Sequence, residues 1–342
     1  MEAIRIGLVG PGAIGAVHRD AIAATEGVVL AAFAGGSPET RARFAATTDA
    51  AGHETAEGMI AAGGLDAVVI ATPGGLHDAP AGAALAAGLH VLVEKPLATD
   101  LDAARALTRL ARASGLVCAT VSQRRFEPAH RYLHRHLQAG ALGRPLLIEA
   151  HVHWHRDAAY YAEKPWRRTE LHGGGSLFNQ GIHSLDLMLW LGGPVRSVIA
   201  QTANMDGAEA AETLCQALLV FDSGARGALT TTTATPPGRP ATLGLFTDRG
   251  HALLHQSAVA EWTLPVPPPP DAAGPASGAA RPLDIGLAGH VAQWRDFRDA
   301  IRHRRPPAIG FADGLAAVRT VAAIYRAAAT GRRVPLSEMG DD

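Results

Sequence analysis

This sequence of 342 residues has few cysteines and no excess of basic or acidic residues. It also has no long apolar run. Its two cysteines, Cys118 and Cys215, lie in apolar, strand-like runs, which is typical of buried free thiols in a reducing compartment. No apolar run approaches the ~18–20 residues of a membrane-spanning helix. An apolar strand that begins by Ile4 leaves no room for a signal peptide. We therefore expect a cytoplasmic protein without a membrane partner.

The charges are balanced and dispersed. Lysine and arginine total 31 against 32 acidic residues, the net charge is −1, and no run of five like charges occurs. Nucleic acid is therefore not an expected partner, because phosphate-backbone binding requires a basic surface. An apolar fraction of 47% and a charged fraction of 18% are typical of a globular chain. The length favours two domains.

The first part of the chain, residues 1–122, alternates short apolar runs with Ala-rich helical stretches. This alternation predicts a parallel sheet with crossover helices. Strands are expected at residues 4–10, 28–34, 66–72, 90–94 and 116–121, with helices at 13–24, 78–87 and 100–113.

The second part, residues 123–342, has a different texture. One helix (127–140) is followed by runs with period-two character at 145–156, 195–204, 212–221, 224–235, 241–248 and 250–256. The Pro-rich segment 265–282 is expected to be a loop or spacer, and two helices follow at 288–305 and 311–331. This order predicts an α+β domain with a large, mostly antiparallel open sheet.

A glycine motif directly follows the first strand. Gly10, Gly12 and Gly15 match G-x-G-x-x-G, in which the glycines permit a tight turn, close approach of a pyrophosphate and close helix packing. Ala13 and Ile14 begin the next helix, whose N–H groups face the anion. Residues 1–122 are therefore predicted to be a dinucleotide-binding Rossmann domain.

The end of the second strand indicates which dinucleotide is bound. Gly35 and Gly36 stand where a carboxylate usually holds the adenine ribose. Ser37 and Arg41 are candidates to bind a 2′-phosphate, and Arg43 is another. NADP(H) is thus the preferred cofactor, with NAD(H) as the alternative. Ser37 is equally well explained as a helix N-cap.

Two long motifs, residues 71–99 and 173–193, together resemble the glucose-fructose oxidoreductase, inositol dehydrogenase and MocA family (Gfo/Idh/MocA) of NAD(P)-dependent oxidoreductases. The resemblance extends from the glycine motif to the C-terminal helix. It implies hydride transfer between a nicotinamide and a hydroxyl or carbonyl carbon of a sugar, polyol or sugar derivative.

The Glu-Lys-Pro triplet of the first motif implies a role for Lys95 near the nicotinamide and substrate. Glu94 and Pro96 shape the turn around it, and the family often has a cis bond before this proline. A lysine at the carboxyl end of a parallel strand also lies where such sheets bind ligands. Further cofactor contacts are expected from Thr72, Pro73 and His77.

The second motif resembles the family pattern G-G-G-x-x-x-D-x-G-x-H and implies that His183 is a catalytic acid or base. Asn179 replaces the usual aspartate, so Lys95 and His183 are expected to share the proton transfer. A helix from about residue 178 would place residues 179, 183 and Asp186 on one face. The glycines at 173–175 would let the backbone pass close to nicotinamide and substrate.

Further substrate contacts are expected from residues on two other segments: Arg125, Tyr160, Trp166 and Arg167. Arg168 replaces a glycine of the family pattern, and Arg125 has the alternative of pairing with an acid in the core. His151, His153 and His155 share one strand face, as metal ligands often do. No nearby acidic or cysteine ligands complete a set, so we expect a polar sheet face or pocket lining and no metal.

Three functions are compatible with these patterns. The first is an NADP(H)-preferring dehydrogenase or reductase of sugars or polyols. The second is a glycosidase that oxidises its substrate transiently, and the third is a non-catalytic NADP(H)-binding regulator. By the same resemblance we expect a homodimer or homotetramer formed through the open sheet of the second domain.

Overall fold

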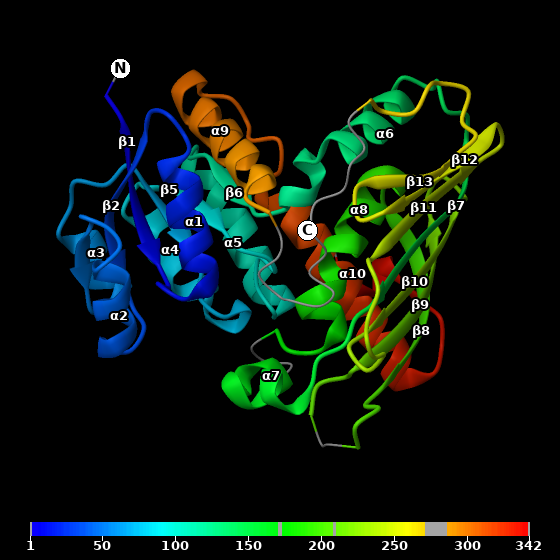
Figure 1. Ribbon diagram of the computed structural model, residues 1–342, viewed down its shortest axis with the longest axis horizontal. Coiled ribbons are helices and arrows are strands. Elements are labelled where there is room, and N and C mark those ends of the chain that lie inside the picture. Colours follow the sequence, from blue (N-terminus) through cyan, green and yellow to red (C-terminus); the bar gives the residue numbers. More distant parts are fainter. Residues whose placement is uncertain (1, 170–172, 208–209, 271–285, 341–342) are drawn as a thin grey trace. The chain divides into compact units, whose positions relative to one another are not determined.

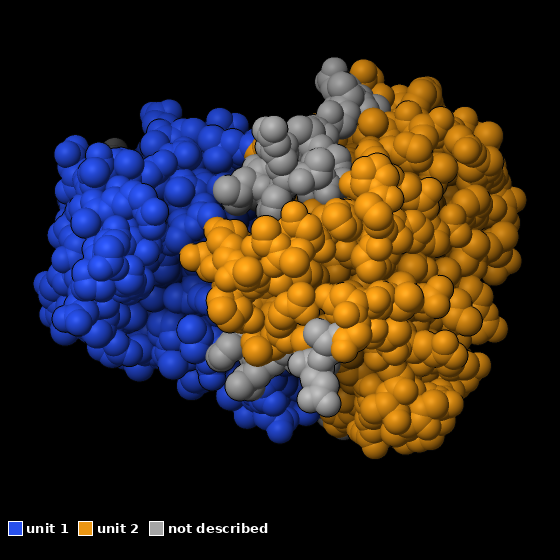
Figure 2. All heavy atoms as spheres, turned by 60° about the horizontal axis from the view of Figure 1, so that its bottom comes forward, with its two compact units in different colours: residues 1–123, 287–315 blue, residues 124–286, 316–342 orange. Residues whose placement is uncertain are grey.

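The computed structural model describes residues 2–169, 173–207, 210–270 and 286–340, which form two compact units (Figure 1). Figure 2 colours them separately: the first comprises residues 1–123 and 287–315, the second residues 124–286 and 316–342. The sequence predicted one boundary, after residue 122. The chain instead returns to the first unit at Leu287, because helix α9 (Ala288–His303) packs its apolar face into the core of that unit.

The sheet of the first unit is parallel, in the order β3-β2-β1-β4-β5-β6. Its strands are β1 (Ile4–Val9), β2 (Val28–Ala34), β3 (Ala51–His53), β4 (Ala67–Ile70), β5 (His90–Val93) and β6 (Cys118–Thr120). The strand order reverses beside β1, which pairs with both β2 and β4. Ligands of such sheets bind at the carboxyl ends of the strands near this reversal. The segments that follow β1, β2, β4 and β5 carry the predicted cofactor residues.

The helices that connect these strands are α1 (Ala13–Ala23), α2 (Pro38–Ala45), α3 (Ala56–Ala61), α4 (Asp78–Ala86) and α5 (Leu101–Ser114). Each of α2, α3 and α5 begins at a side-chain N-cap, provided by Ser37, Thr55 and Asp100. Helix α9 contacts α1 (Figure 1).

The sheet of the second unit has the order β13-β12-β11-β7-β10-β9-β8-β14, in which only the described pair β7 and β10 is parallel. Its strands are β7 (Pro145–His153), β8 (Val195–Ala203), β9 (Leu214–Phe221), β10 (Arg226–Thr232), β11 (Thr242–Thr247), β12 (Gly250–His255), β13 (Ala258–Trp262) and β14 (Val334–Pro335). The helices are α6 (Pro128–Gln138), α7 (Ala158–Glu163), α8 (Ile182–Gly192) and α10 (Phe311–Thr330), the last of which crosses the division between the units.

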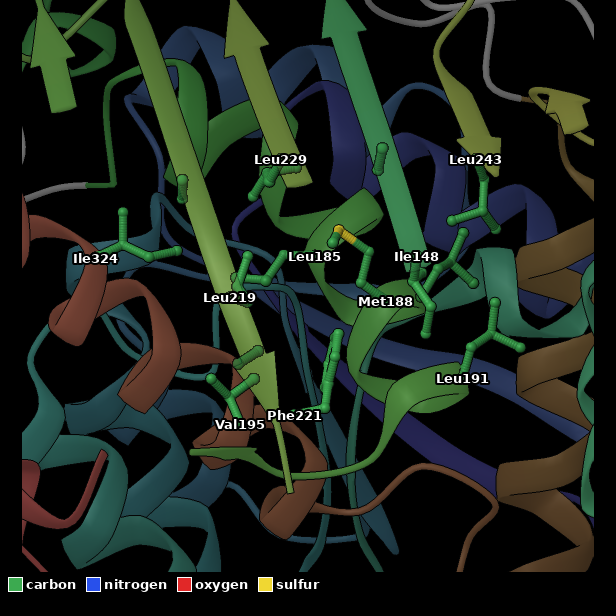
Figure 3. Close-up of a cluster of buried hydrophobic side chains, with 14 of the residues drawn as sticks. Ile148, Leu185, Met188, Leu191, Val195, Leu219, Phe221, Leu229, Leu243 and Ile324 are labelled. Carbon is green, nitrogen blue, oxygen red and sulfur yellow. The ribbon is translucent and has the colours of Figure 1, made fainter. Parts of the chain in front are cut away.

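One face of this sheet is covered by an apolar core. Figure 3 shows side chains of α8 directed toward those of the strands: Leu185, Met188 and Leu191 toward Ile148, Leu219, Phe221 and Leu229. The alternating burial along β9 matches its predicted period of two. Helix α8, which carries His183, is thereby fixed to the sheet.

The predicted fold class, a Rossmann domain followed by an α+β domain with a mostly antiparallel sheet, is confirmed. The sequence missed five elements of six residues or fewer: β3, β13, β14, α3 and α7. Residues 271–282 of the Pro-rich segment lie outside the described residues. Within the described part of the chain, no helix combines the length and apolar character needed to cross a bilayer.

Candidate active site

The glycine loop joins β1 to α1, and its glycines serve different purposes. Gly10 has φ +99°, and a Cβ on it would lie 2.6 Å from the carbonyl oxygen of Ala71. A Cβ on Gly15 would overlap the carbonyl oxygen of Gly10. Gly12 is exposed, and a Cβ there would meet no atom within 4 Å. The protein's own packing thus requires Gly10 and Gly15, whereas Gly12 leaves open space at the mouth of the helix.

The N-terminus of α1 fits an anionic ligand. Gly12 is its N-cap residue, and no side chain among the described residues caps this end of the helix. The N–H groups of Ala13, Ile14 and Gly15 belong to the first helical turn, which offers no intrahelical carbonyl. These groups would hold the pyrophosphate of a dinucleotide, with the helix dipole favouring its negative charge.

The loop after β2 shows how Ser37 and Arg41 are used. Gly35 and Gly36 have φ values of +88° and +75°. The hydroxyl of Ser37 accepts the N–H of Thr40 at 3.2 Å, so Ser37 performs the capping role that was its alternative interpretation. Arg41 donates from Nη1 to the carbonyl oxygen of Gly36 at 2.6 Å, which places its guanidinium beside the loop.

The Glu-Lys-Pro turn directly follows β5, and the peptide bond between Lys95 and Pro96 is cis. Glu94 is buried, and its Oε2 accepts the backbone N–H of Lys95 at 3.0 Å. Its Oε1 lies 3.0 Å from Nε2 of His18. Burial alone would raise the pKa of the Glu94 carboxyl, but the hydrogen bond from His18 and the nearby charge of Lys95 hold this pKa well below its usual range.

His77 connects two of the predicted cofactor loops. Its Nδ1 lies 2.7 Å from the carbonyl oxygen of Pro96 and its Nε2 lies 2.8 Å from that of Thr72. Pro73 follows Thr72 and begins a short 3₁₀ turn. The ring of His77 is 1% exposed, and burial lowers its pKa. The His77 ring thus lies between the loop after β4 and the Glu-Lys-Pro turn, and a neutral ring donates to one of the two carbonyls; its contact with the cofactor stays a prediction.

In the second unit, Asn179 and His183 lie on consecutive helical segments. Residues Leu177–Gly181 form a π-helical turn, and α8 begins at Ile182, so the predicted helix is present with a wider first turn. Such turns are frequent at functional sites. Both side chains are partly exposed, whereas the rest of the segment is largely buried.

Asp186 and Arg125 form a buried ion pair. Nε of Arg125 lies 2.8 Å from Oδ2 of Asp186, and Nη2 lies 2.5 Å from Oδ1. The guanidinium also lies over the ring of Trp190, 5.5 Å from its centroid. The structure thus shows the alternative role of Arg125, pairing with an acid in the core, and its substrate contact stays a prediction.

Three of the predicted substrate residues lie together. The hydroxyl of Tyr160 accepts from Nδ2 of Asn179 at 3.2 Å, and the guanidinium of Arg167 lies over the Tyr160 ring, 3.9 Å from its centroid. Trp166 is half-buried in the 3₁₀ turn Pro165–Arg168. Arg168 turns elsewhere and pairs with Asp206 at 3.2 Å.

Sequence reasoning missed Glu212, which holds the start of the π-helical turn. Its buried carboxylate accepts the N–H of Ser176 at 3.0 Å and that of Leu177 at 2.8 Å, and it also accepts the hydroxyl of Tyr325 at 3.1 Å. The carboxylate thereby satisfies the helix donor of Leu177, while Ser176 also donates to the backbone carbonyl oxygen of Glu212 at 2.9 Å. No local pattern marks Glu212, because its partners are more than 30 residues away.

The glycine run has a structural purpose within the second unit. A Cβ on Gly174 would lie 2.6 Å from the carbonyl oxygen of Arg167. Gly175 has φ +91°, and a Cβ there would overlap the Glu212 carboxylate. The prediction explained these glycines by close approach to nicotinamide and substrate. In the structure, Gly174 and Gly175 admit the 3₁₀ turn and the carboxylate instead.

The histidines of β7 remain a polar sheet feature. The rings of His151 and His153 lie 5.4 Å apart, and Nδ1 of His153 accepts from Nε of Arg239 at 3.1 Å. His155 lies on the lining of a cavity of about 570 Å³ in the second unit, together with Arg156, Tyr161 and Arg168. In the described ranges, no group of three or more potential ligands is placed to hold a metal.

Comparison with known proteins identifies the family. Residues 4–122 match the model of an oxidoreductase family with an NAD-binding Rossmann fold, and residues 130–253 match the Gfo/Idh/MocA C-terminal domain. The rhizopine catabolism protein MocA of Rhizobium meliloti is 30% identical over 322 residues, which are 93% of each chain. The chain belongs to the Gfo/Idh/MocA family.

Two further proteins resemble this chain. Inositol 2-dehydrogenase 4 of Saccharopolyspora erythraea is 33% identical over 231 residues, which are 67% of this chain and 65% of that enzyme. The WlbA dehydrogenase from Bordetella pertussis, solved in complex with NADH and UDP-GlcNAcA, superimposes with a TM-score of 0.89 at 30% identity over 98% of both chains. This Gfo/Idh/MocA protein is therefore an NAD-binding oxidoreductase, and the resemblance noted in its motifs is confirmed.

Proposed function

We propose that the protein is an NAD(P)-dependent dehydrogenase or reductase of a sugar, polyol or sugar derivative. The observation that carries the proposal is the uncapped N-terminus of α1 beside the strand-order reversal, in a chain whose relatives include inositol and sugar-nucleotide dehydrogenases. A panel of polyols, sugars and sugar nucleotides, assayed by absorbance of the reduced nicotinamide, tests it. Turnover with none of them would contradict it.

The chain's own residues have separate tasks in this proposal. The nicotinamide, when bound, exchanges a hydride with the carbinol or carbonyl carbon of the substrate. Lys95 and His183 share the transfer of the hydroxyl proton, since a neutral imidazole accepts a proton and an ammonium donates one. Asn179, oriented by Tyr160, binds a substrate hydroxyl in place of the family's aspartate. Arg167 and Trp166 supply the surrounding contacts.

We also propose a preference for NADP(H) over NAD(H). Residues 34–38 contain no acid to hold a ribose 2′-hydroxyl, and the Arg41 guanidinium lies beside this loop. The Arg41→Ala variant should weaken NADPH binding about tenfold or more, as expected for loss of a charge-assisted hydrogen bond, and leave NADH binding unchanged. Titrations that follow energy transfer from tryptophan to the reduced nicotinamide measure both. Arg112→Ala, at an exposed arginine of α5, is the matched control, and tighter binding of NADH by the wild type would contradict the preference.

Two other functions make distinct predictions in the same assays. A glycosidase that uses its nicotinamide transiently would release product from a glycoside without net accumulation of reduced cofactor. A non-catalytic regulator would bind the cofactor and turn over no substrate. The replacement of the family's aspartate by Asn179 favours keeping the regulator as the second candidate.

We propose a homodimer or homotetramer that forms through the open face of the second-unit sheet. Ile199, Leu218 and Ala228 are cross-strand neighbours on this face, and Leu218 is 61% exposed. Leu218→Arg should convert the oligomer into a monomer at micromolar concentration, as measured by sedimentation velocity. Leu110→Arg, at a 50% exposed leucine of α5, is the control. A wild-type protein that sediments only as a monomer would contradict the proposal.

A cytoplasmic location completes the proposal. Cys118 and Cys215 are both free and buried, and burial raises the pKa of both thiols, that of Cys118 to about 11. Such thiols suit a reducing compartment.

A further inference from the structure

Helix α9 brings Trp294 against His18 of α1. The indole Nε1 lies 3.1 Å from Nδ1 of His18, and the two rings meet edge to face with centroids 5.8 Å apart. An indole N–H only donates, so Nδ1 of His18 accepts this bond and carries no proton. Helix α9 lies outside both segments that match the family models.

The fixed orientation of His18 determines how it meets Glu94. His18 is 1% exposed and Glu94 is 4% exposed. Since Nδ1 carries no proton, the proton of the ring is on Nε2, which donates to Oε1 of Glu94 at 3.0 Å. Oε2 of the same carboxylate accepts the backbone N–H of Lys95 at 3.0 Å. A continuous chain of hydrogen bonds therefore leads from Trp294 to the backbone of Lys95.

A carboxylate is the side chain that this arrangement requires. Two donors, the His18 ring and the Lys95 backbone, approach the two oxygens of Glu94. An amide would offer one oxygen and oppose its NH₂ group to the other donor. Burying the charge of the Glu94 carboxylate costs free energy. A second histidine ring lies near this carboxylate, with Nε2 of His290 4.0 Å from Oε1 of Glu94. The retention of a costly buried charge beside Lys95 indicates a functional use.

We propose that Trp294, His18 and Glu94 are positioning residues that fix the backbone of Lys95 for proton transfer. The inference rests on the proposed function, because that function assigns proton transfer to Lys95. The other side of the same turn is held by the bond between His77 and the Pro96 carbonyl. Helix α9 thus acts on Lys95 through Trp294, by way of His18 and Glu94. None of these three side chains contacts substrate in this proposal.

Two variants of His18 separate positioning from packing. Glutamine has an NH₂ group to donate to Glu94 and an oxygen to accept from Trp294, whereas leucine fills space without either. We expect His18→Leu to lower kcat by about 10- to 100-fold, with KM and the dissociation constant of the reduced cofactor within threefold of wild type. His18→Gln should retain kcat within about threefold. Equal losses in the two variants would overturn the proposal.

A second comparison uses α9 itself. Trp294→Phe removes the indole donor, and Val291→Ala removes buried apolar volume from the same helix and the same core cluster. We expect Trp294→Phe to lower kcat about tenfold and Val291→Ala to leave kcat within twofold, although both lower the melting temperature. A kcat that follows the melting temperature in both variants would show a purely structural role.

The tautomer of His18 tests the inference without any substrate. A long-range ¹H–¹⁵N spectrum of histidine-labelled protein, assigned with His18→Gln, should show the His18 proton on Nε2 and none on Nδ1. Trp294→Phe should disturb that signal. A proton on Nδ1 would overturn the proposal. If no substrate in the panel is turned over while this tautomer is found, the proposed function fails and the hydrogen-bond chain stands.

Discussion

Replacing Lys95 by alanine is expected to lower kcat by about 10²–10⁴-fold, the usual contribution of general acid–base catalysis. His183→Ala should have an effect of the same size, because the two groups share one proton transfer. Both side chains are partly exposed, so neither substitution leaves a large cavity and the melting temperature should change little. Steady-state kinetics with a substrate from the panel and thermal unfolding measure the two quantities.

The chain provides a closely matched control for Lys95. Lys164 also stands in a Glu-Lys-Pro triplet, but it is exposed in the second unit. Lys164→Ala should therefore retain full activity. If Lys95→Ala and Lys164→Ala behaved alike, Lys95 would have no part in the chemistry.

Gly175→Ala is expected to be the most damaging single-methyl substitution near His183. Two costs combine: the left-handed backbone at φ +91° costs about 1–2 kcal/mol for a non-glycine residue, and the new Cβ overlaps the Glu212 carboxylate. Displacing that carboxylate removes the acceptor of the buried Leu177 N–H, at about 1–3 kcal/mol. The start of the helix that carries His183 should shift, and kcat should fall by about 10²-fold.

Gly193→Ala, at the end of α8, measures the cost of the left-handed backbone alone. Gly193 has φ +78°, and a Cβ on it would meet no atom within 4 Å. Denaturant unfolding should give a smaller loss of stability for Gly193→Ala than for Gly175→Ala. Glu212→Gln should resemble Gly175→Ala in kcat, because the NH₂ group of the amide would face the N–H of Ser176 or that of Leu177. Equal losses at the two glycines would rule out the role assigned to Glu212.

Features formed by consecutive residues were predictable from the sequence. The strand, glycine turn and helix around Gly10–Gly15 adjoin in the chain, and each has its own local pattern. The Glu-Lys-Pro turn and the helix that carries His183 were found for the same reason. The fold class followed from the order of such elements, since alternating strands and helices specify a parallel sheet.

Features that depend on distant partners were not predictable. His18 and Trp294 are 276 positions apart, and nothing near either residue indicates the other. Glu212 stands alone before β9, so its role as a cap appears only once Ser176 is beside it. Arg125 and Ser37 each had two interpretations. The ion pair of Arg125 depends on the position of Asp186, and the capping bond of Ser37 on that of the Thr40 N–H.

The return of the chain to its first unit also affects how the protein is made. Helix α9 supplies Val291, Trp294 and Phe297 to the core of the nucleotide-binding unit, yet it is translated long after Gln123. At roughly 5–20 residues per second, the ribosome needs roughly 10–40 s to reach the end of α9. During that interval the nascent sheet exposes the apolar surface that α9 later covers. The nucleotide-binding unit is thus completed only after synthesis of β7 to β13 of the second unit's sheet, which reverses the usual order of folding from the N-terminus.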